Sequence, residues 1–125
     1  MSKQNKKHIL IIEDEAMVSE ALRIFLEGEY NIEIARDGKS GLKKLQTEMP
    51  DLVLLDLLLP IVDGFKILEI AQNDPKTKHI PIIVITNLGQ DKDIDKAFAL
   101  GASSFMIKTE RKLSEVSKKI KDALS

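Results

Sequence analysis

The sequence predicts one α/β domain built on a doubly wound, five-stranded parallel sheet with helices on both faces. Short apolar runs rich in β-branched residues alternate five times with segments of helical periodicity, the pattern of parallel strands joined by crossover helices. Several runs are continuously apolar, as in strands covered on both sides. The chain has 125 residues, which fits a single domain. We expect that domain at residues 7–125 and a flexible, basic end at residues 1–6.

The first two strands flank a helix. The apolar run at residues 8–12 stops at an acidic pair, and residues 16–26 then carry apolar side chains at helical spacing. Gly28 is a suitable end for that helix. The next run, at residues 32–35, is shorter and more alternating, which favours a strand nearer the edge of the sheet.

The middle of the chain contains the second helix, the third strand and the third helix. Asp37 can cap the second helix, and Pro50 lies beyond its end. Residues 52–55 form a wholly apolar run that stops at Asp56. After a loop containing proline and glycine, residues 64–73 again show helical spacing.

The last part of the chain completes the pattern. The fourth strand is expected at residues 82–85 and the fifth at residues 104–107. Residues 91–100 form the helix between them, closed by a glycine. A final amphipathic helix spans residues 113–124.

The composition excludes several classes of site. The chain has no cysteine, which rules out a disulfide framework, a cysteine-based zinc site and a thiol nucleophile, and which suits a reducing cytoplasm. The formal net charge is -1 with acidic and basic residues interspersed, so we expect no direct binding to nucleic acid. The apolar run at residues 9–12 is too short for a signal-peptide core or a membrane span, so we expect no membrane partner.

Polar residues follow four of the five expected strands. Glu13 and Asp14 follow the first strand, Asp56 the third, Thr86 the fourth and Lys108 the fifth. The carboxyl ends of parallel strands lie along one edge of the sheet, where ligands bind at the point of reversed strand order. These side chains are therefore expected to converge although they are far apart in sequence.

The residue types fit phosphoryl transfer. Clustered carboxylates repel one another unless a cation shares the site, and a hard, oxygen-rich site suits Mg²⁺. A carboxylate can act as a nucleophile and form an aspartyl phosphate. A lysine ammonium and a threonine hydroxyl are suitable partners for phosphoryl oxygens.

At this point the sequence resembles the receiver domains of bacterial two-component response regulators, from about Lys7 to Leu124. The segments that carry the resemblance are ILIIEDE at residues 9–15, DLVLLDLLLP at 51–60 with Asp63-Gly64 following, PIIVIT at 81–86 and GASSFMIK at 101–108. Each motif alone is weak, whereas their order and their positions at strand ends make the combination specific. The resemblance implies a flavodoxin-like fold with strand order 2-1-3-4-5.

The resemblance implies that Asp56 accepts the phosphoryl group. Asp14 and Asp56 would bind Mg²⁺ or Mn²⁺ directly, together with the backbone carbonyl of Leu58. Glu13 would act on the cation through a water molecule. Taken alone, Asp56 could equally be a turn residue, and the acidic pair could cap the first helix.

The resemblance also assigns the residues that respond to phosphorylation. Thr86 and Lys108 would bind the phosphoryl group once it arrives. Phe105 would be the aromatic switch residue that turns inward when Thr86 moves. Taken alone, Thr86 could be an ordinary β-branched strand residue and Phe105 an ordinary core residue.

The function implied is that of a phosphoacceptor receiver in two-component signal transduction, acting in the cytoplasm. The phosphoryl donor would be a phosphohistidine on a sensor histidine kinase or a phosphotransfer protein. Phosphorylation would shift a conformational equilibrium and alter the face made by the fourth helix, the fifth strand and the fifth helix, where an output partner binds or a homodimer forms. Such a domain assists its own phosphorylation and dephosphorylation but is not an enzyme acting on an outside substrate.

Four residues depart from the family pattern. Receivers usually carry proline after the lysine, with a cis peptide bond, whereas this chain has Thr109, which predicts a trans bond or a strained cis bond. Asn87 replaces a residue that is usually small. Leu58 and Leu88 occupy two positions that influence hydrolysis of the aspartyl phosphate, and leucine cannot orient a water molecule, so we expect a long-lived phosphorylated state.

Three other functions remain open at this point. A receiver-like interaction module that does not signal by phosphate is the first, and the departures at Asn87 and Thr109 leave room for it. A phosphohydrolase with an aspartate nucleophile usually needs a second acid shortly after the nucleophile, and leucines follow Asp56 here. A flavodoxin-like nucleotide binder needs a glycine-rich loop after the first strand, which this sequence lacks.

Overall fold

The computed structural model describes residues 6–110 and 112–125, which form strands and helices in strict alternation. The strands are β1 (His8–Ile12), β2 (Asn31–Ala35), β3 (Leu52–Leu55), β4 (Ile82–Thr86) and β5 (Ser104–Ile107). The helices are α1 (Ala16–Leu26), α2 (Gly38–Glu48), α3 (Gly64–Asn73), α4 (Asp91–Ala99) and α5 (Leu113–Leu124). Residues 1–5 of the expected flexible end lie outside the described residues.

The strands form one parallel sheet in the order β2-β1-β3-β4-β5. This confirms the doubly wound, flavodoxin-like arrangement. β2, the strand with the alternating sequence, lies at an edge, as that alternation predicted. The inner strands β1, β3 and β4 are almost wholly buried, as their unbroken apolar sequences predicted.

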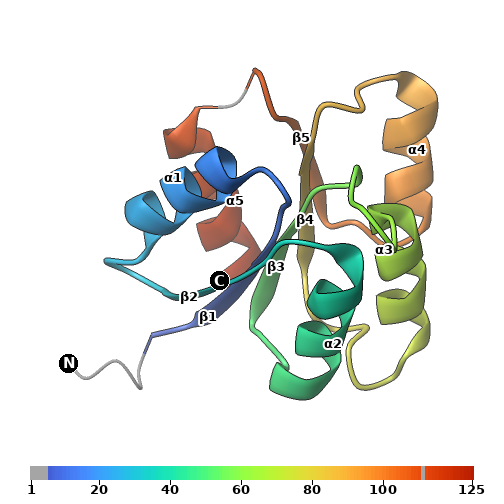
Figure 1. Ribbon diagram of the computed structural model, residues 1–125, viewed down its shortest axis with the longest axis horizontal. Helices are drawn as coiled ribbons and strands as arrows, with labels where there is room; N and C mark the ends of the chain where they lie inside the picture. Colours follow the sequence, from blue (N-terminus) through green and yellow to red (C-terminus); the bar gives the residue numbers. More distant parts are fainter. Residues whose placement is uncertain (1–5, 111) are drawn as a thin grey trace.

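Alternate residues of each inner strand supply two separate cores, because successive side chains of a strand point to opposite faces. In β3, Leu52 and Leu54 pack in the layer that contains α1 and α5, whereas Val53 and Leu55 pack in the layer that contains α2, α3 and α4. Figure 1 shows these two helical layers on either side of the sheet. Among the described residues, no helix is both long enough and apolar enough to cross a bilayer.

The carboxyl ends of β1, β3, β4 and β5 lie together at one end of the strands, which we call the carboxyl edge of the sheet (Figure 1). Gly64 brings the beginning of α3 close to this edge. A Cβ atom on Gly64 would lie 2.5 Å from the Cα atom of Leu57 and 2.6 Å from the carbonyl oxygen of Asp56, so a larger residue could not pack there without a backbone shift. The first turn of α3 therefore packs directly against the backbone of the residues that follow β3.

Candidate functional site

Four of the polar residues that follow the strands are buried at the carboxyl edge. Glu13 and Asp56 are each 3% exposed, Thr86 is 0% exposed and Lys108 is 9% exposed. Backbone hydrogen bonds hold them in line: Asp56 N–H donates to the carbonyl of Ile12 (3.0 Å), and Lys108 N–H donates to the carbonyl of Thr86 (2.8 Å). The sheet thus brings these residues together from opposite ends of the sequence.

The ammonium group of Lys108 is the centre of the site. Its Nζ atom lies 2.8 Å from Asp56 Oδ2, 2.9 Å from Glu13 Oε1 and 2.5 Å from Glu15 Oε1. An ammonium group has three N–H donors, so one carboxylate is available for each. The charge of Lys108 therefore compensates acids from the ends of β1 and β3, while the lysine itself follows β5.

Burial and the carboxylates act on Lys108 in opposite directions. Burial alone would lower the pKa of the ammonium, because removal from water disfavours the charged form. Hydrogen bonds to Asp56, Glu15 and Glu13 outweigh that effect and raise the pKa of Lys108 above its ordinary value. The lysine is thus a fixed positive charge at the edge of the sheet.

Glu13 shows the opposite balance. Its Oε1 atom faces Lys108, and its Oε2 atom accepts a hydrogen bond from the N–H of Glu15 (2.9 Å). Burial nevertheless raises the pKa of the Glu13 carboxyl above its ordinary value, because these two partners do not fully replace the lost hydration. Ionisation of Glu13 therefore costs more free energy here than in water, and additional positive charge nearby would favour it.

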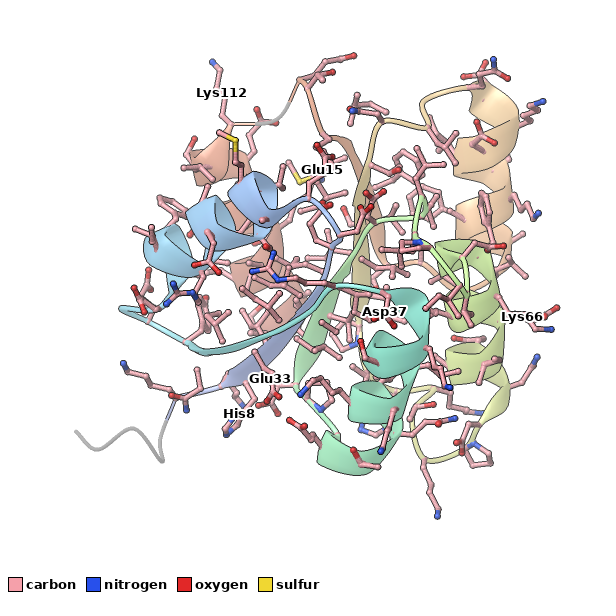
Figure 2. All side chains as sticks on the ribbon, in the orientation of Figure 1. His8, Glu15, Glu33, Asp37, Lys66 and Lys112 are labelled. Atoms are coloured by element: carbon pink, nitrogen blue, oxygen red, sulfur yellow. The ribbon has the colours of Figure 1, made fainter. Side chains whose placement is uncertain are left out.

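Glu15, which the sequence analysis did not single out, lies next to Lys108. Glu13, Glu15 and Asp56 each offer a carboxylate oxygen, and these oxygens lie within 4.8 Å of one another, whereas Asp14 is exposed and outside this group. The backbone is extended at Glu15, and the carboxylates of Glu13 and Glu15 both reach Lys108. Figure 2 shows Glu15 at this edge, beside the beginning of α1.

The sequence contained a signal for Glu15 that the motif obscured. The third acid of the run follows the first by two residues, which is the repeat of an extended chain. Continuing the periodicity of β1 past its last residue would have identified Glu15 as a neighbour of Glu13.

Asp56 is held at both of its carboxylate oxygens. Oδ2 faces Lys108, and Oδ1 accepts a hydrogen bond from the backbone N–H of Leu58 (3.1 Å). The Leu58 side chain is 53% exposed, so it leaves the acid and lies at the surface. The backbone at Leu58 is thus next to the carboxylate, as a role for its carbonyl in cation binding requires.

Thr86 and Phe105 lie on neighbouring strands and face the same layer. Phe105 pairs with Val84 and Ile107 with Thr86, so side chains two residues apart on β4 and β5 share one face of the sheet. Phe105 is half-buried and packs against the core beneath α3 and α4. The Thr86 hydroxyl is buried, with the Leu88 N–H 3.4 Å away.

Two of the departures from the family pattern are hydrogen-bonded to each other. The backbone N–H of Thr109 donates to Asn87 Oδ1 (3.2 Å) and links the loops after β4 and β5. A proline at position 109 would have no N–H to donate. The structure has no cis peptide bond between described residues, so the bond from Lys108 to Thr109 is trans, as the absence of proline predicted.

The arrangement combines a buried carboxylate, a fixed ammonium, a buried hydroxyl and additional acids at the end of a parallel sheet. Among the residues that the structure describes, Glu13, Glu15 and Asp56 are the acids grouped closely enough to share a cation. Oxygen donors of this kind suit a small, hard divalent ion. The two histidines do not take part, since His8 lies at the opposite edge (Figure 2) and His79 lies in the exposed loop before β4.

Comparison with known proteins identifies the fold and the family of the sequence. The profile of the response regulator receiver domain matches residues 9–121. A relative from Synechocystis, the DNA-binding dual master transcriptional regulator RpaA, is 39% identical over 101 residues, which is 80% of this chain and 42% of that protein. This chain spans between 22% and 44% of the length of the curated relatives that it matches.

Solved structures agree with this match. A CheY-like response regulator receiver domain protein from Methanospirillum hungatei superposes with a TM-score of 0.89 at 28% identity, covering 96% of this chain and 94% of the other. The Mn²⁺-bound form of the response regulator Rcp1 superposes with a TM-score of 0.79 at 29% identity, covering 93% and 90%. The similarity thus extends over nearly the whole chain.

Proposed function

The chain belongs to the response regulator receiver family, a family of phosphorylation-based signalling modules, and we propose that Asp56 is the phosphoryl acceptor of this one. The observation that carries the proposal is the Asp56 carboxylate, buried at the end of β3 and held 2.8 Å from the Lys108 ammonium. The donor is a phosphohistidine on a sensor histidine kinase or on a phosphotransfer protein. The module modifies itself and has no outside substrate.

The reaction is a nucleophilic attack. A carboxylate oxygen of Asp56 forms a bond to phosphorus while the bond between phosphorus and the histidine nitrogen breaks, and the leaving imidazole takes up a proton. Lys108 stays beside the new phosphoryl oxygens and compensates their charge, and the Thr86 hydroxyl donates a hydrogen bond to one of them. Both groups already lie at the same edge of the sheet.

A divalent cation, Mg²⁺ or Mn²⁺, is part of the proposal. Glu13, Asp14 and Asp56 with the backbone carbonyl of Leu58 would hold it, and it would supply positive charge next to the transferred phosphoryl group. Carboxylate oxygens of Glu13, Glu15 and Asp56, which lie within 4.8 Å of one another, support a cation site at this edge, whereas Asp14 lies outside that group and would have to turn toward it. Burial raises the pKa of Glu13 in spite of its contact with Lys108, so a further positive charge nearby would favour the ionised form. A related protein, Rcp1, has been crystallised with Mn²⁺.

The response to phosphorylation is a shift between two conformations. We place the switch at Thr86 and Phe105, which share a face of the sheet, and the affected surface at α4, β5 and α5. An output partner or a second phosphorylated copy would bind there. Direct nucleic-acid or membrane contacts are not part of this proposal, and we place the reaction in the cytoplasm.

The test is incubation with acetyl phosphate and Mg²⁺ followed by measurement of the intact mass. We expect a phosphate-sized gain in the parent and none in Asp56→Ala. Asp51→Ala is the matched control, since Asp51 lies just before the other end of β3, and it should still take up phosphate. A parent that gains no mass with any donor would instead support the receiver-like module that does not signal by phosphate.

The same samples measure the lifetime of the phosphorylated state. After removal of the donor, we expect slow loss of phosphate, because Leu58 and Leu88 provide no polar group to orient a water molecule. The half-buried Leu88 packs against the core, and Leu58 points to solvent. Replacement of Leu88 by asparagine should shorten the lifetime. Loss within seconds in the parent, with no further acceleration in Leu88→Asn, would contradict this expectation.

A further inference from the structure

Glu15 makes a contact in the site that the acceptor chemistry does not use. Its Oε1 atom lies 2.5 Å from Lys108 Nζ, the shortest of the three contacts of that ammonium. The side chain of Glu15 is 56% exposed, whereas those of Glu13 and Asp56 are 4% and 3% exposed. Glu15 is thus the outer partner of a buried lysine.

The contact matters because Lys108 and a cation would compete at the acceptor. Asp56 Oδ2 is engaged by Lys108 and Oδ1 by the Leu58 N–H. Each carboxylate oxygen can accept more than one partner, but a divalent cation bound at Asp56 would repel the ammonium beside it. The lysine side chain, unlike the backbone N–H of Leu58, can move away from the cation.

A lysine that leaves Asp56 needs another counter-charge. Its side chain is 7% exposed, and an unpaired ammonium at that depth is energetically costly. Glu13 cannot fill this role alone, since it is itself a proposed partner of the cation. Glu15 lies at the surface, and its long side chain can follow the ammonium as it moves.

We propose that Glu15 is a positioning residue for Lys108: it retains the ammonium at the site while Asp56 exchanges that lysine for a divalent cation. The inference rests on the proposed phosphoacceptor function. Glu15 then raises the affinity for the cation indirectly, by offering Lys108 an alternative partner. Without Glu15, Lys108 competes more strongly for Asp56 and Glu13, and the cation binds more weakly.

The experiment is a double-mutant cycle between Glu15→Gln and Lys108→Met, followed by titration with Mg²⁺ alone. Binding is measured from the NMR shifts of the backbone amides at Asp56 and Leu58, without any phosphoryl donor. Glu15→Gln should weaken Mg²⁺ binding by about two- to five-fold, the scale expected for one partly exposed ion pair. In the Lys108→Met background the same change should have no effect.

Two further variants separate contact from charge. Glu15→Asp keeps the charge but shortens the side chain, and it should weaken binding about as much as Glu15→Gln. Glu110→Gln removes an exposed acid from the loop after β5, with no described contact to Lys108, and it should leave binding unchanged. Glu15→Asp also gives a result if Lys108→Met fails to fold.

The outcomes are distinct. An equal loss of affinity from Glu15→Gln with and without Lys108 would overturn the inference, because Glu15 would then act as a direct ligand or as a simple charge. Unchanged binding in Glu15→Gln would overturn it as well. If the parent binds no Mg²⁺, both the proposed cation-dependent function and this inference are wrong. If the parent binds Mg²⁺ but the cycle shows no coupling between Glu15 and Lys108, only this inference is wrong.

Discussion

The carboxyl edge of the sheet and the opposite edge, where the amino ends of the strands lie, carry similar charged groups in different environments. We call the second the amino edge. At the carboxyl edge, Lys108 is 9% exposed and faces buried acids. At the amino edge, Lys44 pairs with Glu33 and Glu48, and all three side chains are between 32% and 47% exposed. Figure 2 shows Glu33 beside His8 at that edge. Pairs of lysine with glutamate or aspartate are thus exposed surface contacts at the amino edge. At the carboxyl edge the lysine compensates carboxylates that are buried.

The cavity and the buried polar side chains lie at different edges of the sheet. A cavity of about 390 Å³ opens at the amino edge, with His8, Glu33 and Lys44 in its wall. The residues to which we assign phosphoryl chemistry lie at the other end of the same strands. A search guided by this cavity would therefore lead away from the proposed site, whereas the buried polar residues lead to it.

The largest expected effect comes from removing the central lysine at each edge. Lys108→Met should destabilise the cation-free protein by about 3 kcal/mol at neutral pH, because it leaves buried carboxylates without a counter-charge. Lys44→Met should cost under about 1 kcal/mol, since water screens that pair. Urea unfolding of both variants measures the difference, and Mg²⁺ should recover part of the loss in Lys108→Met. Equal losses would mean that burial does not separate the two edges.

The pH dependence of stability should have opposite signs at the two edges. Burial raises the pKa of Glu13, so its ionisation destabilises the folded state as pH rises through that pKa. Glu13→Gln should therefore be more stable than the parent at pH 7 without divalent cation, and this advantage should shrink as pH falls toward the ordinary value of 4.5.

Glu33 is the counterpart at the amino edge. Hydrogen bonds from Glu48 and Lys44 lower the pKa of Glu33, so its ionised form adds stability that is lost as pH falls through the lowered pKa. Glu33→Gln should thus be less stable than the parent at pH 7, with a difference that disappears in acid. Urea unfolding at several pH values checks both variants, and parallel curves for parent and variant would refute the assignment.

The sequence predicted the framework of the site but not its inner contacts. Each strand could be placed because an unbroken apolar run ends at a polar residue, and parallel pairing then aligns Asp56, Thr86 and Lys108. These are consequences of periodicity and topology. The contact between Glu15 and Lys108 was not predicted, because it depends on the path of the backbone between β1 and α1, which a motif does not encode.

The loops were the least predictable part. Ile61 has a φ of 74°, a left-handed conformation that is unfavourable for a β-branched residue. The hydrogen bond from Thr109 to Asn87 joins residues from two loops whose approach depends on the register of β4 and β5. The sequence identified both residues as departures from the family, and their contact emerges only in three dimensions.

The smallest expected effect concerns the hydrogen bond between Thr109 and Asn87. It tests whether a polar contact at the carboxyl edge contributes much to stability when it is exposed to solvent. Asn87 and Thr109 lie at this edge but are both exposed. Asn87→Ala should cost at most about 1 kcal/mol, the usual contribution of a hydrogen bond that water can replace. Thr109→Pro removes the donor instead, and the double variant should be no worse than the larger single change, because both remove one interaction.

Urea unfolding measures these stabilities. Hydrogen exchange of the Thr109 amide reports the contact directly, and it should be faster in Asn87→Ala than in the parent. A loss in Asn87→Ala as large as that in Lys108→Met would contradict the comparison between the edges, since an exposed contact would then matter as much as a buried one. The expected order, with Lys108 far above Asn87, assigns the difference to desolvation of charge rather than to the edge itself. Stability at this edge then depends on how deeply each polar group is buried.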